Sequence, residues 1–315
     1  MPLDKIQILQ DRGAMLAEAR AYFAARNVLE VDCPAISHAA SLDVHIDLMP
    51  VLVQGGKTAY LHTSPEYGMK RLLADGIGDI YQLSHVFRDG EFGPRHNPEF
   101  TMTEWYRMGI SFDAFIEEVL DFIRLFVSDL PATRISYREA LLRYAHIDYM
   151  HASIEDLRVA AQKYSAQTKE SKQLWNREDL LQLLLNAAVE PHLGIDSLCV
   201  FTDYPASEAA LARTYWKEDE HVAERFEIYY KGVELANGYH ELADPIEQRK
   251  RFEETEEMRR ALGKKPLPVD EHFLKALEKG LPDCCGVAVG FDRLLLLRHS
   301  KTSLAEVLPI SWPDA

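Results

Sequence analysis

The sequence has few cysteines and no long apolar stretch, and each shortage excludes a class of protein. Cysteine occurs at four positions, Cys33, Cys199, Cys284 and Cys285. Their spacing forms neither a C-x-x-C metal-binding pair nor a disulfide framework, so we expect a reduced, cytoplasmic setting. The longest apolar runs, around 180–189 and 294–297, are far shorter than a membrane-spanning helix. The first residues, Met1–Lys5, lack the basic segment and apolar stretch of a secretion signal.

Positive charge is also in short supply. Lys and Arg number 35 against 50 Asp and Glu, a net charge of −15, in a chain of 315 residues that is 47% hydrophobic and 27% charged. This excess of negative charge does not favour a protein that coats nucleic acid, although it is compatible with a local basic groove. The length allows about two domains of roughly 150 residues, or one large α/β or α+β unit.

Three familiar catalytic motifs are missing. Gly56-Lys57-Thr58 ends like a phosphate-binding loop, but Val51 stands where that motif requires glycine. His240-Glu241 is not followed by the second histidine of a zinc helix, and no G-x-S-x-G elbow supports a serine hydrolase.

Apolar periodicity and turn residues predict strands mixed with helices. In the first part of the chain we expect a helix at 14–25, a short strand at 28–31 and a hairpin at 44–62, followed by a helix with Ser64 as N-cap, Pro65 at its first position and Gly76 beyond its end. Strands at 80–88 and 98–108, joined by the loop 89–97, come next, and a mainly helical region follows at 112–190. The last part is expected to show strand character at 226–237, a charged helix with a solvated face at 247–263, and a glycine-rich strand at 286–290 followed by a helix. Because strands and helices do not alternate as βαβ units, we expect an α+β fold with an antiparallel β-sheet flanked by helices.

The segment 84–106 carries a chemically unusual strand pair. If 98–106 is a strand, side-chain alternation places Phe100, Met102, Glu104 and Tyr106 on one face. An arginine, an aromatic ring, a carboxylate and a phenol on one sheet face, with Arg88 on the preceding strand, suit a nucleotide and an amine better than a dry core. A half-buried hairpin with polar decoration remains the alternative.

A second hairpin is predicted at 226–241, with Lys231-Gly232 as a tight turn. In this register Tyr229 faces Glu234, and Glu227 lies diagonal to Glu234 on the same face, roughly 7–8 Å away. Two carboxylates at this spacing could complete the coordination of Mg²⁺ with phosphate oxygens and water. A solvated pair of glutamates is the alternative.

The last segment of interest, 286–293, joins a glycine-rich strand to a helix. Glycines in a strand allow a ligand to approach the backbone. Arg293 is expected in the first helical turn, where the helix dipole disfavours a cation, so a bound polyphosphate would explain it. A surface salt bridge is the alternative.

Taken in order, these segments resemble the three motifs of class II aminoacyl-tRNA synthetases. The helix, strand and Pro34 at 14–34 resemble motif 1, 87–106 resembles motif 2, and 286–293 resembles motif 3. Within the class, 96–102 and 234–238 are most similar to the lysine-specific branch. The resemblance implies a class II catalytic domain that is a homodimer.

A lysyl-tRNA synthetase of this kind would carry an anticodon-binding barrel before motif 1, which here starts at about residue 14. We therefore expect residues 1–315 to form a single catalytic domain with no anticodon-binding domain, and the chain resembles the elongation factor P–(R)-β-lysine ligase family. Ala288, where lysyl-tRNA synthetases usually carry glycine, favours the same family because an added methyl group would alter which lysine isomer fits.

This resemblance implies a two-step reaction. ATP would activate (R)-β-lysine or lysine as an aminoacyl-adenylate, with Mg²⁺ as metal, and the acyl group would then pass to a lysine ε-amine of elongation factor P, with no stable tRNA binding and no membrane contact. No enzyme nucleophile is required, so catalysis rests on positioning and charge stabilisation.

Site residues follow by the same resemblance. The catalytic residues would be Arg88 and Arg293. ATP would contact Arg88, Asp89, Gly90, Glu91, Arg95, His96, Asn97, Phe100, Glu234, Leu235, Gly290 and Arg293. The amino acid would contact Ser64, Pro65, Glu66, Glu104, Tyr106, Asn237, Glu241 and Ala288, and the metal would bind Glu227 and Glu234.

One position departs from the family pattern. Motif 2 normally reads Phe-Arg-x-Glu, whereas Phe87-Arg88 is followed here by Asp89-Gly90, with Glu91 one place late. Either the Gly90 backbone or a shifted Glu91 would replace the usual adenine contact. Two other functions stay open on the sequence alone: a truncated synthetase acting on tRNA, and a non-catalytic paralogue that senses an amino acid.

Overall fold

The computed structural model describes residues 3–164 and 175–315, so Met1 and Pro2 of the N-terminal segment lie outside the described residues. The chain divides into two compact units. Unit 1 comprises Met1–Asp129 and Gly238–Ala315, and unit 2 comprises Leu130–Asn237. No helix in the described ranges is long and apolar enough to cross a membrane.

Unit 1 is built on a mainly antiparallel sheet. Its strands are β1 (Leu29–Glu30), β5 (Ile80–Phe87), β6 (Glu99–Met108) and β12 (Cys284–Gly290). β6 lies between β5 and β12 and is antiparallel to both, while β1 pairs in parallel with β5. The strands predicted at 80–88, 98–108 and 286–290 are thereby confirmed to within two residues.

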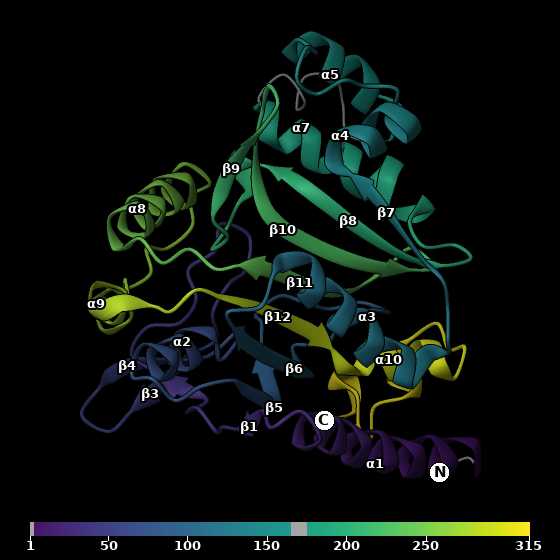
Figure 1. Ribbon diagram of the computed structural model, residues 1–315, viewed down its shortest axis with the longest axis vertical. Coiled ribbons are helices and arrows are strands. Elements are labelled where there is room, and N and C mark those ends of the chain that lie inside the picture. The colour runs from purple at the N-terminus through teal and green to yellow at the C-terminus, as the bar shows by residue number, and fades with distance from the viewer. Residues whose placement is uncertain (1–2, 165–174) are drawn as a thin grey trace. The chain divides into compact units, whose positions relative to one another are not determined.

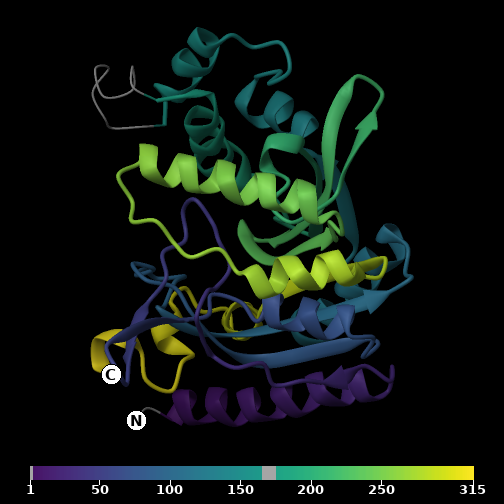
Figure 2. The same cartoon turned by 90° about the vertical axis from the view of Figure 1, so that its left-hand side faces the viewer.

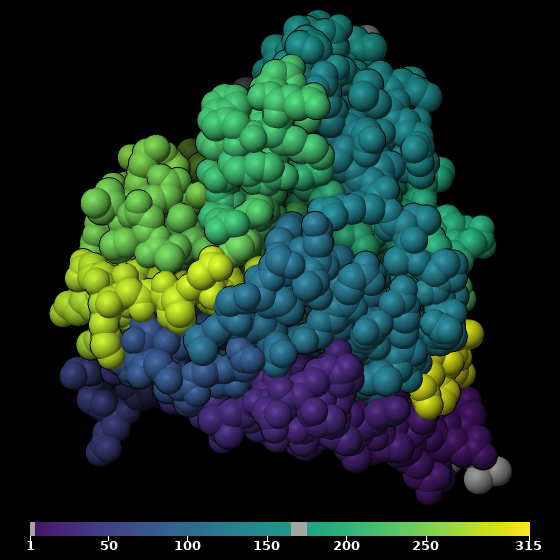
Figure 3. Space-filling model, viewed as in Figure 1, coloured from purple at the N-terminus to yellow at the C-terminus, as the bar shows by residue number. Residues whose placement is uncertain are grey.

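Helices cover one face of this sheet. They are α1 (Leu3–Ala24), α3 (Phe112–Val127) and α10 (Phe291–Arg298), with α3 in the foreground of Figure 1. Trp105 of β6 is fully buried under them. Phe23 of α1 stacks on Tyr81 of β5, with 4.1 Å between the two ring centroids. Each large aromatic side chain buried in this way contributes about 2–3 kcal/mol. Figure 3 shows α1, in purple, and α3 as one continuous surface.

The opposite sheet face carries the even-numbered residues of β6, because side chains alternate along a strand. The register places Glu104 opposite Gln82 of β5 and Ala288 of β12. It also places Tyr106 opposite Gly286. The predicted grouping of 100, 102, 104 and 106 on one face is therefore confirmed.

The rest of unit 1 adds a small sheet and further helices. The small sheet has the order β2 (Ile36–Ser37), β4 (Lys57–Leu61), β3 (Pro50–Val53), which confirms the predicted hairpin. The helices are α2 (Glu66–Ala74), α8 (Pro245–Ala261) and α9 (Glu271–Gly280), which lie together in Figure 2, and the chain ends in the short turns η5 (Leu304–Glu306) and η6 (Trp312–Asp314).

Two sequence expectations in this unit need correction. Helix α2 begins one residue later than predicted, because Pro65 rather than Ser64 is its N-cap, and the Ser64 hydroxyl instead accepts a hydrogen bond from the Glu66 amide at 2.9 Å. The charged helix, α8, does not simply present a solvated face. Its Arg259 is 2% exposed and donates to the Asp43 carbonyl and to the Asp47 carboxylate, at 2.8 and 3.0 Å.

Unit 2 combines helices with a second set of strands. The elements are β7 (Ala132–Ser136), α4 (Tyr137–Ala140), η1 (Leu141–Ala145), α5 (Ile154–Ala161), α7 (Arg177–Leu184), η2 (Leu185–Val189), η3 (Glu190–His192), β8 (Leu198–Pro205), η4 (Ala206–Glu208), β9 (Thr214–Lys217), β10 (Glu220–Tyr230) and β11 (Val233–His240), whose last residues belong to unit 1. β8 pairs in parallel with β7 and antiparallel with β10. Lys231 and Gly232 both have positive φ, 52° and 64°, which confirms the tight turn between β10 and β11.

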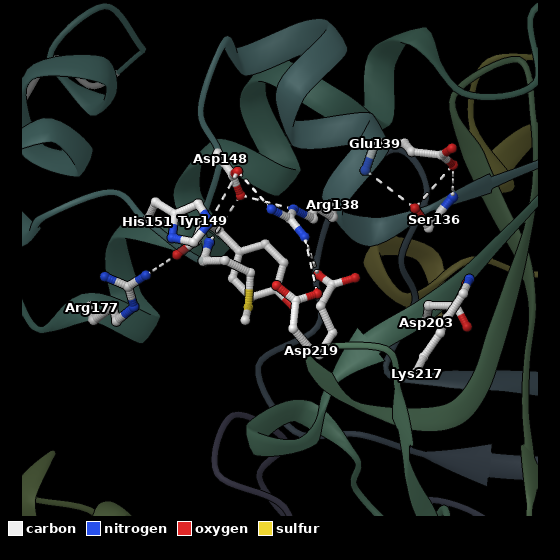
Figure 4. Close-up of polar contacts among 12 residues, drawn as sticks. Ser136, Arg138, Glu139, Asp148, Tyr149, His151, Arg177, Asp203, Lys217 and Asp219 are labelled. Atoms are coloured by element: carbon white, nitrogen blue, oxygen red, sulfur yellow. Dashed lines mark hydrogen bonds and ion pairs between the residues drawn. The ribbon is translucent and has the colours of Figure 1, made fainter.

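Surface polar contacts fix the ends of the helices in unit 2 (Figure 4). Ser136 and Glu139 form a reciprocal capping box at the start of α4. Arg138 binds Asp148 through two nitrogens, at 3.0 and 2.8 Å. Ion pairs with this degree of solvent access contribute at most about 1 kcal/mol each, so we assign them a structural role.

Candidate active site

The strand β6 presents polar side chains where a sheet would ordinarily present apolar ones. Glu104 is 2% exposed and accepts hydrogen bonds from the Ser64 hydroxyl at 2.6 Å and the Tyr106 hydroxyl at 2.7 Å. Burial, followed by the nearby charge of Glu66, raises the pKa of Glu104 to about 7. This carboxyl is therefore poised between its charged and neutral forms near neutral pH.

A second carboxylate group surrounds a lysine that the sequence analysis did not single out. Lys70, on α2, is 1% exposed, and its Nζ lies 2.6 Å from Oε1 of Glu66 and 2.5 Å from Oε2 of Glu241. Burial lowers the pKa of Lys70, but the charges of Glu241 and Glu66 outweigh it and hold the pKa above its ordinary value. Burial raises the pKa of Glu241 to about 8, against the opposing effect of Lys70. We call Ser64, Glu66, Lys70, Glu104, Tyr106 and Glu241 the carboxylate cluster.

Strand β12 is shaped to admit this cluster. A Cβ built on Gly286 would lie 2.3 Å from Cε1 of Tyr106 and 2.4 Å from Oε1 of Glu241. The glycine is thus required by side chains of the protein itself. Ala288, by contrast, has room for its methyl group and stands opposite Glu104 in the register.

At the other end of the same strands lies a group of cations, the arginine cluster of Arg88, Arg95, His96 and Arg293. Arg88 Nη1 lies 3.4 Å from Oε1 of Glu91, while its buried Nε has no hydrogen-bond partner among the residues that the structure describes. Burial, then the charge of Arg293, lowers the pKa of His96, with Glu91 opposing and Arg88 and Arg95 adding to the effect. Neutral His96 accepts from Nη2 of Arg293 through its Nε2, 3.3 Å away, because an arginine can only donate.

The remaining predicted ATP residues of unit 1 adjoin this cluster. The Arg88 guanidinium lies over the Phe100 ring, 5.1 Å from its centroid. The Asn97 side chain donates to the Glu99 carbonyl at 2.6 Å and accepts from the Trp312 amide at 3.1 Å. The turn after Arg88 contains Asp89, whose amide donates to the Asp47 carbonyl, and Gly90, with a φ of 76°. Gly290 is the last residue of β12, three positions before Arg293.

Arg293 is held in place by residues outside the predicted site. Its neighbour Asp292 is 2% exposed, and one of its carboxylate oxygens accepts from the Thr101 amide at 2.8 Å. The other oxygen pairs with Arg12 of α1, which also donates to the Thr101 hydroxyl at 2.7 Å. This contact joins the start of α10 to strand β6, and so fixes motif 3 against motif 2.

The two predicted metal ligands lie in unit 2. Glu227 of β10 is 6% exposed and accepts from Arg225 Nη2 and from the Tyr229 hydroxyl, both at 2.6 Å. Glu234 is the second residue of β11 and raises the pKa of the Tyr229 hydroxyl, after burial and Glu227. Within the described residues, no group of three or more His, Cys, Asp or Glu side chains is placed to hold a metal ion.

The structure therefore brings most of the predicted residues into two clusters of unit 1. Those in or beside the clusters are Ser64, Pro65, Glu66, Arg88, Asp89, Gly90, Glu91, Arg95, His96, Asn97, Phe100, Glu104, Tyr106, Glu241, Ala288, Gly290 and Arg293. Those in unit 2 are Glu227, Glu234, Leu235 and Asn237. The buried Oδ1 of Asn237 has no hydrogen-bond partner within residues 3–164 and 175–315. The sequence analysis missed Lys70, although its i,i+4 spacing from Glu66 was a readable signal.

Comparison with known proteins agrees with the three motifs. Residues 4–312 match the family described as tRNA synthetases class II (D, K and N). The chain is 45% identical over 316 residues to the elongation factor P–(R)-β-lysine ligase of Salmonella typhi, covering 98% of this chain and 95% of the relative. The proteins of the same name from Salmonella choleraesuis and Salmonella heidelberg match equally well, with 45% identity and the same coverage. The chain therefore belongs to the class II tRNA synthetase family (D, K and N) and, within it, to the elongation factor P–(R)-β-lysine ligases.

Proposed function

We propose that this protein is an ATP-dependent ligase that activates (R)-β-lysine or lysine as an aminoacyl-adenylate and transfers it to a lysine ε-amine of elongation factor P. The synthetase family implies the use of ATP, and relatives at 45% identity over 98% of the chain carry the ligase name.

One observation carries this proposal: the two clusters lie at opposite ends of one strand face. Phe100, beside the arginine cluster, and Glu104, in the carboxylate cluster, are four residues apart on β6. At about 3.4 Å per residue this separation is roughly 14 Å. An extended ligand with ammonium groups at one end and a nucleotide at the other fits such a face.

The residues of unit 1 divide the work accordingly. Glu104, Tyr106 and Glu241, with the 64–66 segment, receive the ammonium groups through charged hydrogen bonds. Arg88 binds the α-phosphate, where negative charge develops as the substrate carboxylate attacks the phosphorus. Arg95, His96 and Arg293 bind the rest of the triphosphate. Phe100 stacks on adenine, Asn97 orients the ligands, and Asp89, Gly90, Glu91 and Gly290 complete the nucleotide contacts.

Unit 2 contributes the proposed metal ligands. Carboxylate oxygens are the ligands that Mg²⁺ prefers, and a carboxylate has about four acceptor positions. Glu227 uses three of them, for Arg225, Tyr229 and Tyr204. Glu227 and Glu234 would hold the ion, which neutralises phosphate charge when bound. Leu235 and Asn237 follow on β11 as nucleotide and substrate contacts respectively.

The wider proposal covers assembly and acceptor. We propose that residues 4–312 act as one catalytic domain, since the family match occupies that range. The protein would work as a cytoplasmic homodimer without stable tRNA binding.

The test offers labelled lysine or (R)-β-lysine and ATP to the protein, with elongation factor P and bulk tRNA as separate acceptors. Label on elongation factor P is the expected result. Label on tRNA alone would make the protein a truncated synthetase and refute the proposal.

A further inference from the structure

Lys70 occupies a place that the proposed reaction does not explain. It is a fully buried cation in direct contact with two carboxylates, Glu66 and Glu241, of which only the first is near it in sequence. A buried ion pair costs desolvation energy, so it is weak evidence for stability alone. A structural role would be served equally well by apolar side chains of similar volume.

The net charge of the carboxylate cluster indicates a functional role for Lys70. Glu66, Glu104 and Glu241 supply three negative charges when ionised, and Lys70 supplies one positive charge. The excess is two negative charges. An amino acid with two ammonium groups neutralises that excess, whereas one with a single ammonium group leaves a carboxylate unpaired.

We propose that Lys70 is a positioning and specificity-determining residue that sets the carboxylate cluster to accept two ammonium groups. It does so by pairing with Glu66 and Glu241 and fixing both side chains, which favours the charged form of Glu241, so that the cluster selects diamino acids over amino acids with one amino group. The inference rests on the proposed function, because it assigns the cluster to the amino-acid substrate.

The geometry supports a role in holding carboxylates rather than in touching substrate. Both contacts of Lys70 are at hydrogen-bond length, and its Nζ lies 5.9 Å from the ring centroid of Phe273 on α9. Removing its charge leaves two neighbouring carboxylates without a shared partner. One of them then takes up a proton and ceases to attract an ammonium group.

The experiment measures ATP–pyrophosphate exchange with lysine or (R)-β-lysine for the wild type, Lys70→Gln and the control Lys279→Gln. Lys279 is an exposed lysine on α9 that pairs with Asp75 at 2.6 Å. Lys70→Gln should raise the KM for the amino acid at least tenfold while the KM for ATP changes less than twofold. It should also reduce, at least tenfold, the preference for lysine over norleucine in competition for the site. The control should match the wild type.

A second variant distinguishes charge from packing. Lys70→Ala removes the side chain, and n-propylammonium should restore a third or more of the lost kcat/KM, whereas propan-1-ol of similar size should not. Equal rescue by both compounds, or unchanged KM and selectivity in Lys70→Gln, would overturn the proposal. Loss of folding in both variants, monitored by thermal melting, would make Lys70 a structural residue and overturn it equally. A wild-type protein that activates no diamino acid would instead refute the proposed function.

Discussion

Gly286 offers the sharpest test of how the carboxylate cluster is built. A methyl group at this position would lie 2.3 Å from Cε1 of Tyr106 and 2.4 Å from Oε1 of Glu241, whereas ordinary contacts begin at 3.4 Å. Both side chains must therefore retreat by about 1 Å in Gly286→Ala. Neither can do so cheaply, because Tyr106 is hydrogen-bonded to Glu104 and Glu241 is paired with Lys70.

The structure sets the expected size of the effect. Overpacking of a close-packed site costs about 1–3 kcal/mol of unfolding free energy. Displacing substrate-binding groups by about 1 Å costs roughly 100-fold in rate, which is about 2.7 kcal/mol of transition-state stabilisation. We expect kcat/KM for the amino acid to fall about 100-fold in Gly286→Ala. The KM for ATP should change little, because the arginine cluster lies several residues along the strands.

The assay is ATP–pyrophosphate exchange at varied amino acid, combined with urea unfolding. Gly13→Ala is the matched control, because a Cβ there meets nothing within 4 Å and Gly13 lies in the interior of α1. It should leave exchange unchanged and raise the unfolding free energy by about 0.5–1 kcal/mol. Wild-type exchange and stability in Gly286→Ala would refute the reasoning, since they would mean that Tyr106 and Glu241 do not require the glycine.

Four further outcomes are expected. Arg293→Ala should abolish ATP–pyrophosphate exchange, and near-full exchange would remove Arg293 from the site. Asp292→Ala should lower the unfolding free energy by about 3–5 kcal/mol, measured in urea, because it leaves the Arg12 guanidinium, on a side chain that is 11% exposed, without its carboxylate. Arg259→Ala should cost about 1–3 kcal/mol in the same measurement, since it orphans the carbonyls that Arg259 satisfies. The KM for the amino acid should rise about tenfold or more as pH falls from 8 to 6. Glu104 and Glu241, with pKa values of about 7 and 8, become protonated over this range and then no longer attract the ammonium groups of the substrate. A KM that does not change with pH would contradict this assignment.

Local pattern was enough to predict most of unit 1. Period-two alternation placed Glu104 and Tyr106 on one face, and the antiparallel pairing of β6 with β5 and β12 agrees with it. The glycine-rich strand and the helix after it were also predicted, because glycine and charge at 286–293 leave few alternatives. The strand β7 was missed because its residues are mostly exposed and show no clear alternation.

Long-range ion pairs were beyond the reach of local pattern. Arg259 contacts carbonyls more than 200 positions earlier in the chain, so nothing in the charged helix itself distinguished it from its solvated neighbours. Arg12 and Asp292 are likewise far apart in sequence and meet only because α1 and α10 cover the same sheet face. Such residues carry no motif, since their partners are set by tertiary packing.

The identity of a motif residue and the identity of a residue that supports it thus have different physical causes. A motif residue contacts the ligand, so its identity follows from the chemistry of phosphate or ammonium. Lys70 and Asp292 contact only the protein, and their identities follow from the charge that a motif residue leaves uncompensated when it is buried. Glu241 is buried, so it requires a partner of opposite charge. Arg293 lies among other cations, so it requires a neighbouring residue that fixes its position. The type of the supporting residue is therefore predictable from physical chemistry, whereas its position in the chain has to come from the structure.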